Sequence, residues 1–318
     1  MARASPSAAV APALARLRRG LELRASSLLI TVVGDAFAPR GQPIWLGSLI
    51  ELLGLFGISA RLVRTSAFRL NADAWFATTR IGRRSFYSLS DAGLLRVQHA
   101  DQRIYDFNMA QWDGCWTLVL LDPGMRASER QRLQRELSWE SFGRISPHVF
   151  AHPHMHARAL GEIIDATGVA DRVAVLRAQA LPGAGDRPLV SIMHTVFDLA
   201  KVAQAWAHFV DRFTPVLRDA AQLDPAQAFM ARTLLIHEYR RVVLRDPNLP
   251  QAFLPDTWPG AQARSLCEQL YGALLEPSER YLRCVVTTDA GPLQRTPHAI
   301  HRRSAGTGRS DEESDVSR

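Results

Sequence analysis

The chain has 318 residues, which favours two or three domains, and its 47% hydrophobic and 22% charged residues are an ordinary composition for a globular protein. Its apolar runs are shorter than the roughly 18–20 residues that span a bilayer, which argues against a membrane protein. Its three cysteines are far apart in the sequence, which argues against a disulfide framework or a zinc ribbon and fits the reducing cytoplasm: Cys115, Cys267 and Cys284.

The positive charge is concentrated near the N-terminus. The net charge is +7, and the first 110 residues hold 14 Arg against 7 Asp or Glu, so the rest of the chain is electrically balanced. A basic segment attached to a neutral body is typical of proteins that bind nucleic acid. Surface charge also varies among proteins that bind none, so the charge alone does not decide the function.

The first third of the chain is predicted to contain a flexible arm, three short helices and a β-hairpin. Residues 1–24 are rich in Ala and Arg and lack the apolar core of a signal peptide, so we expect a flexible basic arm. Apolar residues then recur at helical spacing over 26–37, 46–57 and 59–71, with Ser26 or Ser27 and then Ser59 as N-caps and Ile44–Trp45 as an extended bridge. Alternating strands follow at 75–80 and 85–89, joined by 81–84.

The remainder is predicted to form two further domains and a tail. Residues 106–181 read as a ferredoxin-like α+β domain, with strands at 116–121, 148–151 and 172–178 and helices at 127–142 and 158–167. A Pro- and Gly-containing linker at 182–185 leads to an all-α domain over 186–287, with helices at 197–213, 225–245, 261–275 and 278–286. Residues 288–318 lose apolar residues and are expected to be disordered.

The helix predicted at 59–71 has two distinct faces. Val63, Ala67 and Leu70 fall on an apolar face. The opposite face carries Arg61, Arg64, Thr65, Phe68 and Arg69. Guanidinium groups on an exposed helix suit a DNA major groove, where arginine bonds guanine edges or phosphates. Ser66 lies beside this face and could bond a phosphate, whereas we place Phe68 in the hydrophobic core in preference to a contact with a thymine methyl group.

The hairpin that follows this helix has a basic tip. Arg80, Arg83 and Arg84 surround Gly82, and carboxylates are absent from residues 61–71 and 77–90. A helix, a short turn containing Gly57, a basic helix and a basic hairpin form the pattern of a winged helix-turn-helix, which we assign to residues 25–105. The expected fold class is therefore a multi-domain α+β protein with an N-terminal winged helix-turn-helix that binds double-stranded DNA.

Several longer segments carry a family resemblance. In the first third they are Pro39-Arg40-Gly41, Trp45–Ile50, Arg64–Leu70 and Ile81–Leu89; further on they are Trp112–Val119, Arg232–Arg241, Leu244–Pro247 and Trp258-Pro259-Gly260. Together they resemble PaaX-type repressors of phenylacetate catabolism over about residues 25–286.

The resemblance implies a fold and a function. It implies a GntR-like winged helix, a ferredoxin-like dimerisation domain and a C-terminal helical domain. It also implies a cytoplasmic, non-enzymatic homodimer that represses an operon and leaves its operator when an aryl-CoA effector such as phenylacetyl-CoA accumulates. Neither a membrane nor a catalytic cofactor or metal is expected.

A possible effector site lies in the predicted helix at 225–245. Tyr239, Arg240, Arg241 and Arg245 could meet the phosphates and adenine of CoA, because arginine forks and aromatic faces suit those groups. The alternative is that Arg241 and Arg245 pair with neighbouring acids such as Glu238 or Asp246. The sequence leaves both interpretations open.

Other candidate sites have less support. The three histidines in His152-Pro153-His154-Met155-His156 could bind a metal, but Pro153 disturbs strand geometry, so loop histidines are the preferred interpretation. Asp122 follows the strand at 116–121, where an acidic residue would stand in a metal-dependent nuclease, although further carboxylates are not evident. The rival hypotheses are therefore such a nuclease or an aryl-CoA-binding enzyme with an accessory DNA-binding domain.

Overall fold

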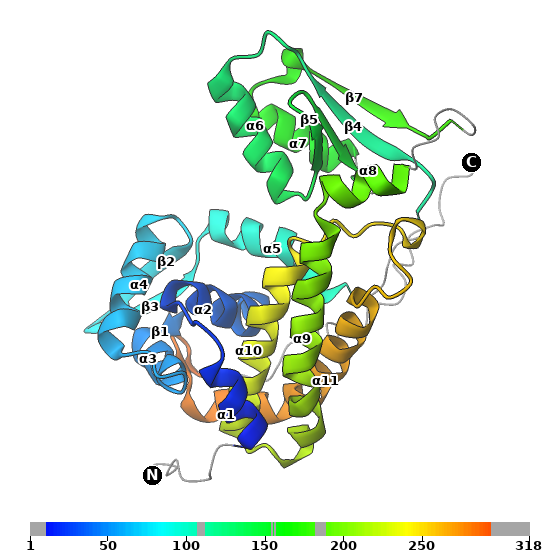
Figure 1. The fold of residues 1–318 in the computed structure, drawn as a ribbon. Coiled ribbons are helices and arrows are strands. Elements are labelled where there is room, and N and C mark those ends of the chain that lie inside the picture. Colours follow the sequence, from blue (N-terminus) through cyan, green and yellow to red (C-terminus); the bar gives the residue numbers. More distant parts are fainter. Residues whose placement is uncertain (1–10, 107–111, 154, 156, 182–188, 294–318) are drawn as a thin grey trace, which may run out of the picture. The chain divides into compact units, whose positions relative to one another are not determined.

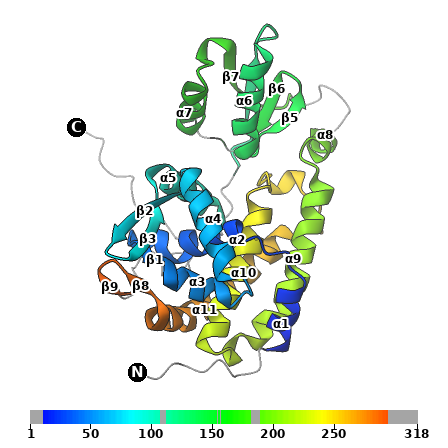
Figure 2. The same ribbon diagram turned by 90° about the vertical axis from the view of Figure 1, so that its left-hand side faces the viewer.

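A computed structural model describes residues 11–106, 112–153, 155, 157–181 and 189–293. These residues form two compact units that do not coincide with the three predicted domains (Figures 1 and 2). Unit 1 draws on residues 1–107, 209–240 and 262–318, and unit 2 on residues 108–208 and 241–261. The helices predicted as a separate C-terminal domain are thus shared between the two units. The linker predicted at 182–185 lies outside the described residues.

The N-terminal part of unit 1 begins with a packed helix. Helix α1 spans Pro12–Arg19, and its Leu14 and Leu17 are buried, so at least this part of the chain differs from the predicted flexible arm. Its apolar positions are three residues apart, which places both on one face of a helix. The following elements are α2 (Ala25–Val32), a π-helical turn (Val33–Phe37), a 3₁₀ turn (Ala38–Arg40), β1 (Ile44–Trp45), α3 (Leu46–Gly54), α4 (Ala60–Ala72), β2 (Phe76–Ile81), β3 (Arg84–Leu89) and α5 (Asp91–Tyr105).

The C-terminal part of unit 1 differs from the prediction in two places. Residues 260–285 form one helix that continues through Pro277, because Leu274, Leu275 and Ser278 are buried and their packing holds the helix together across the proline. The predicted tail starts later than expected, since residues 287–293 form a small hairpin that ends in the buried Leu293. The elements are α9 (Leu199–Asp219), a 3₁₀ turn (Ala220–Gln222), α10 (Pro225–Val243), α11 (Gly260–Val285), β8 (Thr287–Thr288) and β9 (Gly291–Pro292). Of the three helices, α9 belongs to unit 1 from residue 209, α10 up to residue 240 and α11 from residue 262.

One sheet joins the two ends of the chain within unit 1. Its strand order is β2-β3-β1-β8-β9. Ile44 of β1 pairs with Tyr87 of β3 on one side and with Thr288 of β8 on the other, antiparallel in both cases. The Ser48 hydroxyl of α3 donates to the Val285 carbonyl at 3.2 Å and accepts from the Thr287 N–H at 3.0 Å. The C-terminal hairpin is therefore an integral part of the N-terminal sheet.

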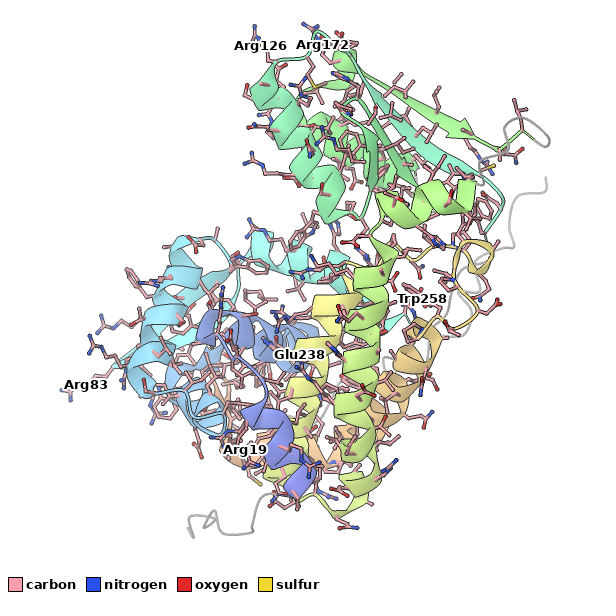
Figure 3. All side chains as sticks on the ribbon, in the orientation of Figure 1. Arg19, Arg83, Arg126, Arg172, Glu238 and Trp258 are labelled. Carbon is pink, nitrogen blue, oxygen red and sulfur yellow. The ribbon has the colours of Figure 1, made fainter. Side chains whose placement is uncertain are left out.

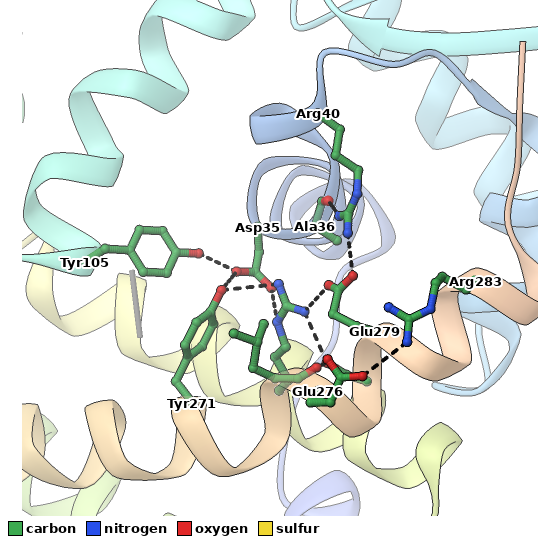
Figure 4. A network of polar contacts seen from close by, with 11 residues as sticks. Asp35, Ala36, Arg40, Tyr105, Tyr271, Glu276, Glu279 and Arg283 are labelled. Carbon is green, nitrogen blue, oxygen red and sulfur yellow. Dashed lines mark hydrogen bonds and ion pairs between the residues drawn. The ribbon is translucent and has the colours of Figure 1, made fainter. Parts of the chain in front are cut away.

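A buried network of charges holds unit 1 together (Figure 4). Arg232 of α10 forms ion pairs of 2.8 Å with Asp35 of the π-helical turn and with Glu279 of α11. Arg40 pairs with the second carboxylate oxygen of Glu279, and the hydroxyls of Tyr105 and Tyr271 donate to Asp35. Burial by itself would lower the pKa of Arg232, but the surrounding Asp35, Tyr271 and Glu279 raise it well above its ordinary value. Arginine therefore stays charged here because both of its acidic partners are buried with it.

Unit 2 contains the predicted α+β domain. Its elements are β4 (Trp116–Leu121), α6 (Ala127–Trp139), β5 (Gly143–Ser146), β6 (Val149–His152), α7 (Ala157–Thr167), a 3₁₀ turn (Ala170–Arg172), β7 (Val173–Ala178), α8 (Leu189–Val196) and a 3₁₀ turn (Gln251–Phe253). All neighbouring strands are antiparallel in the order β5-β6-β4-β7, which is the ferredoxin-like arrangement. The sequence prediction missed β5 and α8.

Both faces of this sheet are covered at its central strand β4, whose side chains alternate between two cores, whereas the edge strand β7 is largely exposed. Val119 and Leu121 face α6 and α7, where they join Leu133 and Leu160 in one core. Trp116 faces a second core with Met193 of α8 and Phe253. In neither unit does the described part of the chain contain a helix that combines the length and the apolar character needed to cross a membrane.

Candidate nucleic-acid interface

A tight turn sets the angle between α3 and α4. The Gly57 N–H donates to the Gly54 carbonyl at 2.9 Å, and Gly57 has a φ of +78°, which glycine adopts without steric cost. Ser59 is the N-cap of α4, as predicted, and its hydroxyl accepts from the Leu62 N–H at 3.3 Å. Phe56 in this turn packs edge-on against Phe229 of α10, with ring centroids 6.2 Å apart. The turn is therefore fixed to the core of unit 1.

Helix α4 presents the predicted arginine face to solvent. Val63, Ala67 and Leu70 are buried where α4 packs against α2, α3 and β2. The exposed residues include Arg61, Arg64, Thr65 and Arg69, the predicted DNA-facing set. The Thr65 hydroxyl donates to the Arg61 carbonyl at 3.0 Å, a bond within the helix that leaves the three guanidinium groups free to project outward.

Two residues of α4 lie on the opposite side from the one predicted. Ser66 is only 7% exposed, which leaves its hydroxyl little room for the predicted phosphate contact. Phe68 is 71% exposed between the arginines, in contrast to the core position that the sequence analysis favours. The helical period explains both corrections, because Ser66 is three residues after Val63 and Phe68 is four residues after Arg64. An exposed phenylalanine on a basic face is suited to apolar contact with a thymine methyl group.

The hairpin that follows α4 has the predicted basic tip. Ile81 and Arg84 are paired, which leaves a two-residue loop of Gly82 and Arg83, and Gly82 has the positive φ of +58° that a type II′ turn requires at that position. Arg80 and Arg83 are exposed, and Arg83 points away from the rest of unit 1 (Figure 3). The exposed Arg84 is held differently, with its guanidinium 4.9 Å from the centre of the Trp45 ring.

The six arginines of α4 and the hairpin have no acidic partners in the described part of the chain. No ion pair within 4.0 Å involves Arg61, Arg64 or Arg69, or the hairpin residues Arg80, Arg83 and Arg84. Cations without carboxylate neighbours keep their full attraction for an external anion, and a row of phosphates is the anion that matches several of them at once.

The predicted effector residues do not form one exposed set. Tyr239 is fully buried, with its ring 5.5 Å from that of Phe209. Arg240 donates to both the carbonyl and the hydroxyl of Ser27, at 3.0 and 2.7 Å, and so ties α10 to α2 within unit 1. Arg241 and Arg245 are exposed and belong to unit 2. The first two residues therefore serve the core of unit 1, because the helix turns them inward, and only the last two are exposed to a ligand.

The histidine cluster and Asp122 are the remaining candidate sites. Of the three clustered histidines, His154 and His156 lie outside the described residues, and among the described ones no three His, Cys, Asp or Glu side chains gather as a metal site. Asp122 accepts from Arg172 and from the Gly124 N–H, both at 2.8 Å. This carboxylate is therefore engaged in holding the end of β4 beside the start of β7.

Comparison with known proteins identifies the family. The PaaX-like protein family matches residues 24–93, its central Cas2-like domain matches residues 109–190, and its C-terminal domain matches residues 197–284. The chain belongs to the PaaX family. The transcriptional repressor PaaX of Escherichia coli (strain K12) is 40% identical over 250 residues, which cover 77% of this chain and 79% of the relative.

The PaaX relative is a transcriptional repressor and not an enzyme, so the comparison places this chain among regulators of transcription. An uncharacterised protein from Mycobacterium tuberculosis has a similar structure, with a TM-score of 0.51 and 23% sequence identity over 80% of this chain and 97% of the other. At that identity the likeness concerns the fold alone. It supports the arrangement of elements described above but adds nothing on ligands.

Proposed function

We propose that this member of the PaaX family is a cytoplasmic transcriptional repressor that binds operator DNA through a winged helix-turn-helix. In this proposal α2, α3 and α4 are the three helices of the motif, and β1, β2 and β3 form its sheet. The observation that carries the proposal is the exposed, acid-free face of α4 beside an equally acid-free basic hairpin. The 40% identical repressor supports it independently.

Helix α4 is the proposed recognition helix. Arg64 and Arg69 would meet guanine edges in the major groove, because a guanidinium can donate two parallel hydrogen bonds to one guanine. Phe68, exposed beside them, would pack on a thymine methyl group. Arg61, Thr65 and the hairpin residues Arg80 and Arg83 would hold phosphates, which fixes the register of the protein on the duplex. Arg84 would do so less freely, because it also packs on Trp45.

A dimer would extend the DNA-contacting site over two half-sites. We propose that the ferredoxin-like domain of unit 2 pairs two copies, and that the two α4 helices then enter major grooves about 34–36 Å apart, or a multiple of that distance. Such an arrangement requires an operator with two related half-sites. Phenylacetyl-CoA or a related aryl-CoA is the proposed effector, and it would release the DNA by favouring a dimer in which this spacing is lost.

Selection from random DNA tests the proposal and identifies the operator sequence at the same time. Duplexes enriched by the wild-type protein should contain a two-fold repeat, and fluorescence anisotropy should give at least about 10³-fold tighter binding to the enriched duplex than to its scrambled version. Equal affinity for both duplexes would contradict sequence-specific repression. Sedimentation of the free protein and of the complex would report the proposed two copies directly.

The effector is tested on the same complex. Phenylacetyl-CoA should release the labelled duplex. CoA alone and free phenylacetate are the matched controls, because they are the two halves of this effector. An Arg241→Ala, Arg245→Ala variant should need more effector for half-release if these exposed arginines meet the phosphates of CoA. Unchanged sensitivity would remove these two residues from the effector site, and a lack of release by any aryl-CoA would remove the effector class.

A further inference from the structure

Helix α1 is a basic helix outside the region that the family comparison matches. The family match begins at residue 24, whereas α1 spans Pro12–Arg19. Leu14 is fully buried and Leu17 is 5% exposed, so the helix is anchored in unit 1 by one face. Its last turn carries the exposed Arg16, Arg18 and Arg19. An anchored helix holds its cations in fixed places, which a flexible arm does not.

The position of Arg18 connects α1 to the proposed recognition helix. A β-carbon built on Gly57 would lie 3.2 Å from a guanidinium nitrogen of Arg18. Gly57 belongs to the turn between α3 and α4, and Arg61, the first arginine of the exposed face, is four residues further along the chain. Arg18 therefore lies next to the turn that leads into the end of α4 at which the basic face begins.

The charge of α1 is not neutralised by neighbouring acids. No described carboxylate lies within 4.0 Å of Arg16, Arg18 or Arg19 as an ion-pair partner, and Glu22 is the one acidic residue among the first 24. Basic residues at a helix C-terminus also interact favourably with the helix dipole. That interaction acts on stability, so it makes a different prediction from a contact with a ligand.

We infer that α1 is an additional DNA-contacting element, whose Arg16, Arg18 and Arg19 hold phosphates of the duplex that flanks the site read by α4. The partner is the DNA backbone rather than base edges, because phosphates outside the recognition site offer anions without a defined sequence. The inference rests on the proposed function, since it extends the same DNA site. A contact from α1 would lengthen the contacted duplex beyond the part bound by the helix-turn-helix and the hairpin.

The test compares two lengths of the selected operator. An Arg16→Ala, Arg18→Ala, Arg19→Ala variant is titrated against a duplex trimmed to the selected site and against one extended by about one helical turn at each end. On the extended duplex, each lost phosphate contact should weaken binding roughly eightfold at 0.1 M salt and reduce the slope of log K against log salt by about 1. On the trimmed duplex the variant and the wild type should bind alike.

The control removes the same charge elsewhere. An Arg212→Ala, Arg218→Ala, Arg280→Ala variant loses three exposed arginines of unit 1 that lie outside the proposed DNA-contacting and dimerisation elements, and it should bind both duplexes like the wild type. If the α1 variant binds the extended duplex with wild-type affinity and slope, or loses the same factor on both duplexes, the inference is wrong. If the α1 variant unfolds at a lower temperature while its DNA binding is unchanged, the arginines stabilise the helix through its dipole and do not contact DNA.

A further variant separates this inference from the proposed function. Arg64→Ala should weaken binding to both duplex lengths, because α4 is the proposed reading element. If Arg64→Ala has no effect, the proposed function fails with it. If Arg64→Ala weakens binding while the α1 variant has no effect on the extended duplex, only the role of α1 is contradicted.

Discussion

Unit 1 uses arginine in two opposite ways. Arg40 and Arg232 are enclosed in the core, where each pairs with Glu279 and Arg232 also pairs with Asp35. Arg64 and Arg83 are exposed on α4 and on the tip of the hairpin, and no described carboxylate pairs with either. The side chain is the same in both regions, and only the environment differs.

The difference shows what each environment requires of the sequence. A buried guanidinium loses its hydration, so it must be surrounded by carboxylates and hydroxyls that come from distant parts of the chain. An exposed guanidinium meant for an external anion needs the reverse, a neighbourhood without acids, so that the protein does not satisfy it internally. The first region therefore determines the stability of unit 1 and the second its affinity for a partner, and substitutions in the two regions should separate these properties.

The largest expected effect is on stability, from Arg232→Met. The substitution leaves Asp35 and Glu279 as buried carboxylates without their shared cation, which should lower the free energy of unfolding by about 3–5 kcal/mol. Urea denaturation followed by circular dichroism measures it. The matched control is Arg283→Ala, which breaks the more exposed pair with Glu276 and should cost about 1 kcal/mol or less. Equal losses for the two variants would mean that the buried network does not hold unit 1 together.

The next effect is on DNA affinity, from Arg64→Ala. Removing a bidentate base contact should weaken binding to the selected operator by about 1–3 kcal/mol, which is about 5- to 150-fold, and should relax the preference at one base pair. The free energy of unfolding should stay within about 0.5 kcal/mol of the wild type, because the side chain is exposed. Anisotropy titration and urea denaturation of the same preparation report both quantities. A stability loss that matches the affinity loss would place Arg64 with the structural arginines.

A smaller and less selective effect is expected from Arg83→Ala. This residue projects from the hairpin tip, so we expect a phosphate contact and no base contact. Affinity should fall by the same factor for the selected and the scrambled duplex, and the slope of log K against log salt should decrease by about 1. Arg84→Ala is the comparison, because its guanidinium packs on Trp45 and its loss should also weaken the hairpin. A change in base preference for Arg83→Ala would contradict the assignment.

The exposed arginine face could be predicted from the sequence because it is local. A helix of 13 residues has a period that the chain itself displays, and the N-cap Ser59 and the glycines at 57 and 82 mark its surroundings. At Ser66 and Phe68 the helical period and the chemical type of the side chain indicate different faces, and the structure follows the period. Most of the βαββαβ order of unit 2 could be predicted for the same reason, because its elements show their own local patterns. Strand β5 is the exception, because its four residues, GRIS, show too little alternation.

The buried network could not be predicted in the same way. Asp35 and Arg232 are far apart in the sequence, and although each stands in an apolar stretch, no local pattern pairs one with the other. The π-helical turn that carries Asp35 appeared only as the end of a regular helix. Because these long-range pairs join α10 and α11 to the N-terminal helices, the division of the C-terminal helices between two units was also beyond the sequence patterns.

The smallest expected effect is on the stability of unit 2. It concerns an arginine that is exposed, like those of α4, but paired with a carboxylate, like those of the buried network. The side-chain hydrogen bond from Arg172, together with the one from the Gly124 N–H, holds the pKa of Asp122 below its usual value of 3.8. The carboxylate therefore stabilises the folded state above about pH 4, and this contribution is lost as the pH falls through the lowered pKa. Asp122→Asn should lower the unfolding midpoint slightly at pH 7, and the two proteins should converge toward pH 2. Because both side chains are exposed, 1 M salt should shrink the difference. Parallel curves at every pH, unaffected by salt, would show that this pair does not stabilise unit 2.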